Sequence, residues 1–152
     1  MLYRVDTREY EVGEMISPNT TFEEQLNGDK KEIEAILNAQ RPKHVPPRSE
    51  CLFLFQELSA ALRFCSVHGG YIYGVSIKTC IFRGDMNILD NIRFVFKLTG
   101  CEALKRSAAQ FYWNPYNHTF HPCYEILAKN ARVEAVLLDA NMREALKTQL
   151  DE

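Results

Sequence analysis

The sequence predicts an α+β fold, because apolar runs typical of strands are interrupted by segments with helical periodicity. The clearest strand covers 71–77, which is rich in aromatic and β-branched residues. Two pairs of predicted strands are close enough in sequence to form hairpins, namely 71–77 with 80–82 and 124–127 with 133–138. A mixed or antiparallel sheet with flanking helices is therefore expected. The 152 residues, 46% hydrophobic and 25% charged, suit a single domain over 1–152.

Local patterns predict the individual elements in order along the chain. The expected strands are 2–6, 52–55, 71–77, 80–82, 124–127 and 133–138. The expected helices after the second strand are 58–65, 88–98, 102–111 and 141–150. An earlier helix is expected to begin at Thr20 or Thr21 and to break at Asn27-Gly28.

Three polar or aromatic segments are expected to be irregular. Residues 40–49 are polar and proline-rich, which predicts an exposed loop of a length that is often functional. Residues 83–87 predict a polar turn. Residues 112–122 predict a loop with four aromatic side chains, which could form a hydrophobic plug or a platform that stacks on a base. The plug is the safer interpretation for some of them.

Charge and cysteine usage exclude several classes of protein. A net charge of −2 argues against non-specific binding to nucleic acid through bulk positive charge, although a local basic groove is still compatible with it. No apolar run approaches the roughly 20 residues of a membrane span, and 1–6 does not resemble a secretory signal. The five cysteines form no CxxC pair, which predicts free thiols in a reducing cytoplasm.

Glu125 is the candidate catalytic carboxylate. It stands between Tyr124 and Ile126 in an apolar strand that follows the aromatic loop. A carboxylate held there is partly desolvated and rigid, which suits one that stabilises developing positive charge. On an alternating strand the same residue can simply face water, and spacing alone favours that second interpretation.

Two arginines and a serine are candidate ligand-binding residues. Arg4 interrupts the first strand and could donate to a phosphate or ribose, or pair with a surface carboxylate. Arg48 and Ser49 end the proline-rich loop, where a guanidinium and a hydroxyl could meet an anionic ligand. The alternative is an ordinary basic loop.

Other site types have weaker support. His118, His121 and Cys123 have the chemistry of metal ligands, but a fourth ligand at matching spacing is lacking, so no metal site is expected. The sequence contains no P-loop, no GxGxxG and no nucleophile elbow, which disfavours a kinase, a dehydrogenase and a serine hydrolase.

The order of the segments resembles an ADP-ribosyltransferase fold. Residues 2–5 and 10–18 resemble the opening of the small rifamycin-inactivating ADP-ribosyltransferases, and 52–61 is similar to their next strand and alanine-rich helix. Residues 70–75 fall where their following strand lies. Tyr124-Glu125-Ile126-Leu127-Ala128 resembles the ending of the DarT-type DNA ADP-ribosyltransferase toxins, which carries their catalytic glutamate.

The resemblance assigns roles to individual residues. It implies that Arg4 holds a ribose of NAD, that Phe53 stacks near the nicotinamide, and that Glu125 engages the nicotinamide ribose. Arg48 and Ser49 could then bind the diphosphate or a ribose. Tyr71, with Tyr73, could complete the wall of the NAD pocket or belong to the core.

Several positions depart from the family pattern. No His-Gly-Thr follows the first strand, and Phe53 lacks a tyrosine hydroxyl. Cys123 stands where arginine-modifying relatives carry Gln or Glu, which disfavours arginine as the acceptor. The aromatic loop corresponds to the part of this fold that contacts the acceptor.

The resemblance thus implies an NAD-dependent mono-ADP-ribosyltransferase that modifies a protein or nucleic acid acceptor. The small size of the chain and the lack of a separate targeting domain suggest a toxin, an effector or a phage-encoded inhibitor. The alternative is an inactive module on the same scaffold that binds a protein or nucleic acid partner. A third option is an antibiotic-modifying enzyme.

Overall fold

Seven strands form one antiparallel sheet in the order β2-β7-β4-β1-β3-β6-β5 in the computed structural model, which describes residues 1–19, 26 and 28–150. The strands are β1 (Leu2–Asp6), β2 (Met15–Ile16), β3 (Leu52–Phe55), β4 (Tyr71–Ser76), β5 (Phe82–Asp85), β6 (Tyr124–Ala128) and β7 (Ala131–Leu138). The helices are α1 (Gly28–Gln40), the 3₁₀ turn η2 (Arg48–Glu50), α2 (Leu58–His68), α3 (Met86–Leu98), α4 (Glu102–Trp113) and α5 (Ala140–Leu150). The predicted α+β class is confirmed, but the two expected hairpins are wrong, because β4 does not pair with β5 and β6 does not pair with β7.

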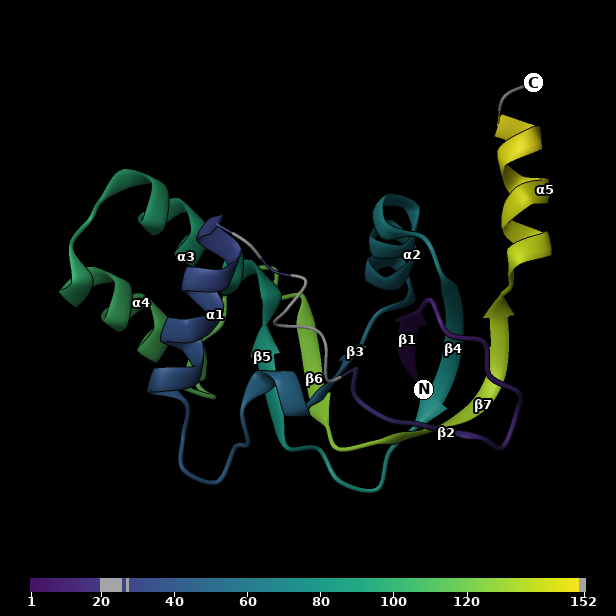
Figure 1. The fold of residues 1–152 in the computed structure, drawn as a ribbon, viewed down its shortest axis with the longest axis horizontal. Helices are drawn as coiled ribbons and strands as arrows, with labels where there is room; N and C mark the ends of the chain where they lie inside the picture. The colour runs from purple at the N-terminus through teal and green to yellow at the C-terminus, as the bar shows by residue number, and fades with distance from the viewer. Residues whose placement is uncertain (20–25, 27, 151–152) are drawn as a thin grey trace.

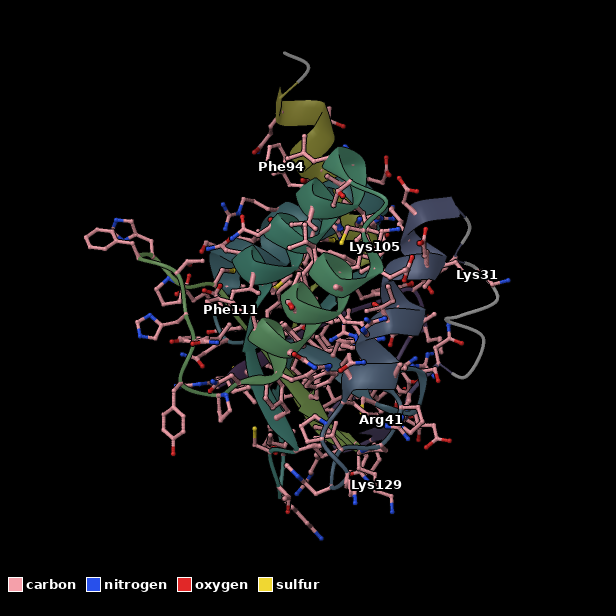
Figure 2. The ribbon with its side chains drawn as sticks, turned by 90° about the vertical axis from the view of Figure 1, so that its left-hand side faces the viewer. Lys31, Arg41, Phe94, Lys105, Phe111 and Lys129 are labelled. Carbon is pink, nitrogen blue, oxygen red and sulfur yellow. The ribbon has the colours of Figure 1, made fainter. Side chains whose placement is uncertain are left out.

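The helices cover the sheet unevenly. Helices α1, α3 and α4 gather beside β5 and β6, α2 lies above the middle of the sheet, and α5 stands apart at the C-terminal end (Figure 1). Figure 2 shows the molecule from the side of α1, α3 and α4, where Phe94 and Phe111 are exposed. Lys105 on α4 is buried, and its Nζ lies 2.8 Å from Oε1 of Glu32 on α1. This ion pair joins α4 to α1.

The extent of strand pairing differs on the two sides of β1, at the centre of the sheet. β1 pairs along its whole length with β4, from Leu2–Val75 to Asp6–Tyr71. With β3, in contrast, it pairs at a single position, Tyr3–Phe55. Because side chains alternate along a strand, this register places the side chains of Arg4 and Glu125 on opposite faces of the sheet.

Buried side chains form three apolar clusters. The first lies between α1, α3, α4 and the β5–β6 end and includes Leu37, Ile92 and Trp113. The second lies on the other face of the sheet around Leu54 and Tyr73. The third lies under α2.

The predicted turn over 83–87 is wrong. Phe82 to Asp85 form β5, in which Arg83 pairs with Ile126 and Gly84 with Glu125 of β6. Asp85 is then the N-cap of α3, where its carboxylate accepts a hydrogen bond from the backbone N–H of Asn87. Residues that are typical of turns therefore form the end of a strand and a helix cap. Pairing with β6 holds Arg83 and Gly84 in the strand, and the Asp85 side chain caps α3.

The aromatic loop begins later than predicted, after Trp113. Tyr112 and Trp113 form the last turn of α4 and are buried in the first cluster, whereas Tyr116 and Phe120 are exposed. The plug interpretation is thus confirmed for the first two aromatic residues only.

The helix start expected at Thr20 or Thr21 lies outside the described residues. Asn27 of the expected break also lies outside the described residues, and α1 begins at Gly28. No helix in the described part of the chain is long and apolar enough to cross a membrane.

Candidate functional site

Glu125 lies at the centre of a buried polar cluster. It is only 6% exposed, and in β6 it stands opposite Phe55 of β3 and Gly84 of β5. Its Oε1 accepts a hydrogen bond from Nη1 of Arg48 at 2.9 Å and another from the hydroxyl of Tyr112. No described residue donates to its other oxygen, Oε2.

Arg48 connects this carboxylate to α1. The η2 turn places its guanidinium, 3% exposed, so that Nε lies 2.9 Å from Oε2 of Glu34. Nη1 also donates to the Tyr112 hydroxyl at 2.9 Å. The guanidinium carbon lies 4.9 Å from the centre of the Phe53 ring. The cluster consists of Arg48, Glu125, Tyr112 and Glu34, and we call it the Glu125 cluster.

Burial and neighbouring charges shift the pKa values of Arg48 and Tyr112. Burial alone would lower the pKa of Arg48, but the neighbouring Tyr112, Glu125 and Glu34 outweigh it and raise that pKa well above its ordinary value. Burial, and then the adjacent Glu125 charge, raise the pKa of Tyr112 well above its ordinary value, so its hydroxyl stays protonated and can donate. The result is a rigid carboxylate whose Oε1 is occupied.

Gly84 makes room for this arrangement. A Cβ built on Gly84 would lie 2.6 Å from the ring of Tyr112, closer than atoms can approach. A glycine opposite Glu125 therefore allows the Tyr112 ring to reach the carboxylate.

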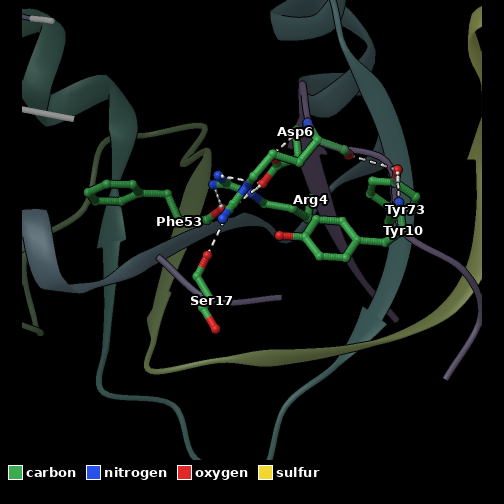
Figure 3. Close-up of polar contacts among 7 residues, drawn as sticks. Arg4, Asp6, Tyr10, Ser17, Phe53 and Tyr73 are labelled. Carbon is green, nitrogen blue, oxygen red and sulfur yellow. Dashed lines mark hydrogen bonds and ion pairs between the residues drawn. The ribbon is translucent and has the colours of Figure 1, made fainter. Parts of the chain in front are cut away.

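Arg4 belongs to a second cluster, shown in Figure 3. Its Nε donates to Oδ2 of Asp6 at 3.0 Å, and its Nη1 donates to the carbonyl of Phe53 at 3.0 Å. Arg8 makes two side-chain bonds to the same carboxylate and one to the carbonyl of Ser17. The contact to Phe53 spans the place where β1 and β3 no longer pair.

The charges of this second cluster are compensated only in part. Burial would raise the pKa of Asp6, but hydrogen bonds from Arg8 and the charge of Arg4 outweigh it and lower that pKa. Burial lowers the pKa of Arg4 despite the neighbouring Asp6. Two arginines share one carboxylate, so the cluster keeps a positive charge.

Phe53 stands between the two clusters. Its carbonyl accepts from Arg4, and its ring lies beside the guanidinium of Arg48. The six predicted site residues therefore do not form one pocket: Glu125 and Arg48 are in contact, Phe53 contacts Arg48 and Arg4, and Ser49 is half-buried in the η2 turn. Tyr71 lies elsewhere, in the wall of a cavity on the face of the sheet that carries Arg4.

Two members of the Glu125 cluster were not predicted. Tyr112 is on the buried side of α4, and Glu34 lies on α1 one residue after the buried Ile33. A carboxylate that lies beside the apolar positions of a helix indicates a partner inside the protein. Glu34, between Ile33 and Leu37, could have been identified in this way. The histidines at 118 and 121 are exposed, and no three metal-ligating side chains come together within the described residues.

Comparison with protein-family models found no match to this chain, and neither did comparison with curated proteins.

Proposed function

We propose that this chain is an NAD-dependent mono-ADP-ribosyltransferase in which Glu125 is the catalytic carboxylate. The observation that carries the proposal is the state of that carboxylate: Arg48 and Tyr112 hold Oε1, and Oε2 accepts no hydrogen bond from any described residue. A fixed carboxylate with one oxygen available can accept a hydrogen bond from a ribose hydroxyl. The sequence resemblance assigns the same residue to that role.

The reaction needs such a group. When the nicotinamide–ribose bond breaks, its electron pair leaves with nicotinamide and positive charge develops on the ribose. A carboxylate fixed near the 2′-hydroxyl stabilises that charge without having to reorganise. The acceptor then attacks the ribose carbon and loses its proton.

Arg48 acts as a positioning residue in this proposal. It is bound to Glu34 and Glu125, so its charge holds the carboxylate in place and is not directed at the diphosphate of NAD. Phe53, which contacts Arg48, is the proposed aromatic wall beside the nicotinamide. Arg4 supports the backbone of Phe53 through its hydrogen bond to the carbonyl.

One observation favours the alternative of an inactive module that binds a protein or nucleic acid partner. Both arginines proposed to bind NAD, Arg4 and Arg48, are compensated by internal carboxylates. An NAD diphosphate would have to compete with Asp6 or Glu34 for them. An inactive module does not need Arg4 or Arg48 to bind NAD, so their internal ion pairs are compatible with it.

Transfer of label from NAD to a cell lysate separates the two functions. Wild type, Glu125→Gln and Glu57→Gln are compared, because Glu57 is an exposed carboxylate outside the cluster. The enzyme predicts label transfer by wild type and Glu57→Gln, and a loss of about 10²–10³-fold in Glu125→Gln. Loss of the label on protease or nuclease treatment identifies the acceptor class. Absence of transfer by all three would favour the binding module.

A further inference from the structure

A cavity lined by three tyrosines lies away from the Glu125 cluster. It has a volume of about 340 Å³, at the lower end of the range for small-molecule sites. Its lining residues are Glu9, Tyr10, Glu11, Val12, Tyr71, Tyr73, Val136 and Asp139. None of them belongs to the Glu125 cluster.

The aromatic rings form a fixed wall. Tyr73 lies in the middle, 5.8 Å from the ring of Tyr10 and 6.0 Å from the ring of Tyr71, measured between ring centres. The hydroxyl of Tyr73 donates to the carbonyl of Arg8 and accepts from the N–H of Tyr10, as Figure 3 shows. These bonds fix the central ring, which is fully buried, so a ligand can reach only the partly exposed rings of Tyr10 and Tyr71.

The charges at this cavity are negative. The carboxylates of Glu9, Glu11 and Asp139 line it, and no lysine or arginine in the described ranges forms an ion pair with any of the three. Asp139 uses one oxygen to accept from the N–H of Met142 at the start of α5. The nearby Arg8 is paired with Asp6 and lies 5.5 Å from the centre of the Tyr10 ring.

From this combination we infer that the cavity binds an organic cation, with an ammonium or guanidinium group against the exposed parts of the Tyr10 and Tyr71 rings and the carboxylates around it. Tyrosine faces attract such cations, and unpaired carboxylates add a complementary charge. An anion such as a phosphate would be repelled by three carboxylates. The cation could belong to a free small molecule or to a basic side chain of a peptide, which present the same chemistry.

Chemical-shift titration of the isotope-labelled full chain tests the inference. The probes are choline and its neutral isostere 3,3-dimethylbutan-1-ol, and N-acetylarginine methylamide and its neutral counterpart N-acetylcitrulline methylamide. We expect saturable shifts at Tyr71 and Val136 with the cations and not with the neutral compounds. Tighter binding of choline indicates a free small cation, and tighter binding of the arginine derivative indicates a peptide side chain.

Variants connect the shifts to the cavity. Tyr71→Leu keeps an apolar side chain and removes the ring, so cation binding should weaken by about twofold to fivefold. Glu9→Gln/Glu11→Gln changes two exposed residues without altering the core, and it should also weaken binding. The matched control, Glu50→Gln/Glu57→Gln, should leave it unchanged. Equal shifts with cations and neutral isosteres, or no saturable shifts, would overturn the inference.

Discussion

Arg48 and Glu125 form a buried ion pair of 2.9 Å between the η2 turn and β6, although they lie 77 positions apart in the sequence. Because Arg48 also binds Glu34, the same guanidinium connects α1 to the sheet. The pair is therefore both a support of the fold and the device that orients the proposed catalytic carboxylate.

Removing the guanidinium should destabilise the protein strongly. Arg48→Gln leaves the buried Glu125 and the partly buried Glu34 without their cation, so we expect the free energy of unfolding to fall by about 3–5 kcal/mol. Urea denaturation measures this loss. Arg93→Gln is the control, because Arg93 forms an exposed pair with Asp90 and its removal should cost at most about 1 kcal/mol. Equal losses in the two variants would contradict the buried role of Arg48.

Adding a methyl group at Gly84 should disturb the Glu125 cluster. In Gly84→Ala the new Cβ would meet the ring of Tyr112 at 2.6 Å, which forces the buried ring or the strand to move. We expect a loss of about 1–3 kcal/mol in thermal or urea unfolding. Gly100→Ala is the matched control, because nothing lies within 4 Å of a Cβ at that position. A stable Gly84→Ala protein would show that Tyr112 is not held against β5.

Asp85 should make stability depend on pH. Burial would raise the pKa of this carboxyl, but hydrogen bonds from Thr119, Cys123 and Asn87 outweigh burial and lower the pKa. A lowered pKa means that the carboxylate stabilises the fold above its ordinary pKa of about 3.9, and that this stabilisation is lost as pH falls through the folded-state pKa. Unfolding at pH 7 and pH 3 should therefore show a smaller difference in Asp85→Asn than in wild type. An equal difference in both proteins would assign the acid sensitivity to other groups.

Mutation should show that some aromatic residues of 112–122 stabilise the core and that others lie on the surface without stabilising it. Trp113 is 4% exposed and its Nε1 donates to the carbonyl of Leu37, so Trp113→Ala should cost about 3–5 kcal/mol of stability. Phe120 is 92% exposed, and Phe120→Ala should change stability by less than about 0.5 kcal/mol. For this reason Phe120→Ala, and not Trp113→Ala, is the variant that tests whether the loop contacts an acceptor. A lower transfer to the acceptor with unchanged NAD cleavage is expected.

Much of the fold could be predicted from local patterns. The strand at 52–55 agrees with β3 because four consecutive apolar residues in a short run favour a buried strand. The strand expected at 80–82 lies at 82–85 instead, because the last residues of β5, Gly84 and Asp85, are typical of turns. Their strand and capping conformations depend on pairing with β6 and on the N–H of Asn87, which lie beyond any local pattern.

The candidate site could be predicted only in part. The isolated carboxylate in an apolar strand singled out Glu125, and the basic end of the proline-rich loop singled out Arg48. Their contact could not be predicted, because it depends on where η2 packs against β6. Tyr71 was grouped with Glu125 and Arg48 because local patterns do not give the strand order and register, which place Tyr71 on the face that carries Arg4 and Glu125 on the opposite face.

The central claim is that Glu125 stabilises the charge that develops when NAD is cleaved. Its most direct test is the rate of nicotinamide release from NAD by the purified full chain, for wild type, Glu125→Gln and the control Glu57→Gln. Thermal unfolding of each protein verifies that it is folded. Our account predicts release by wild type and the control, and a rate lower by about 10²–10³-fold in folded Glu125→Gln. Release by folded Glu125→Gln at the wild-type rate, or no release by wild type, would contradict it.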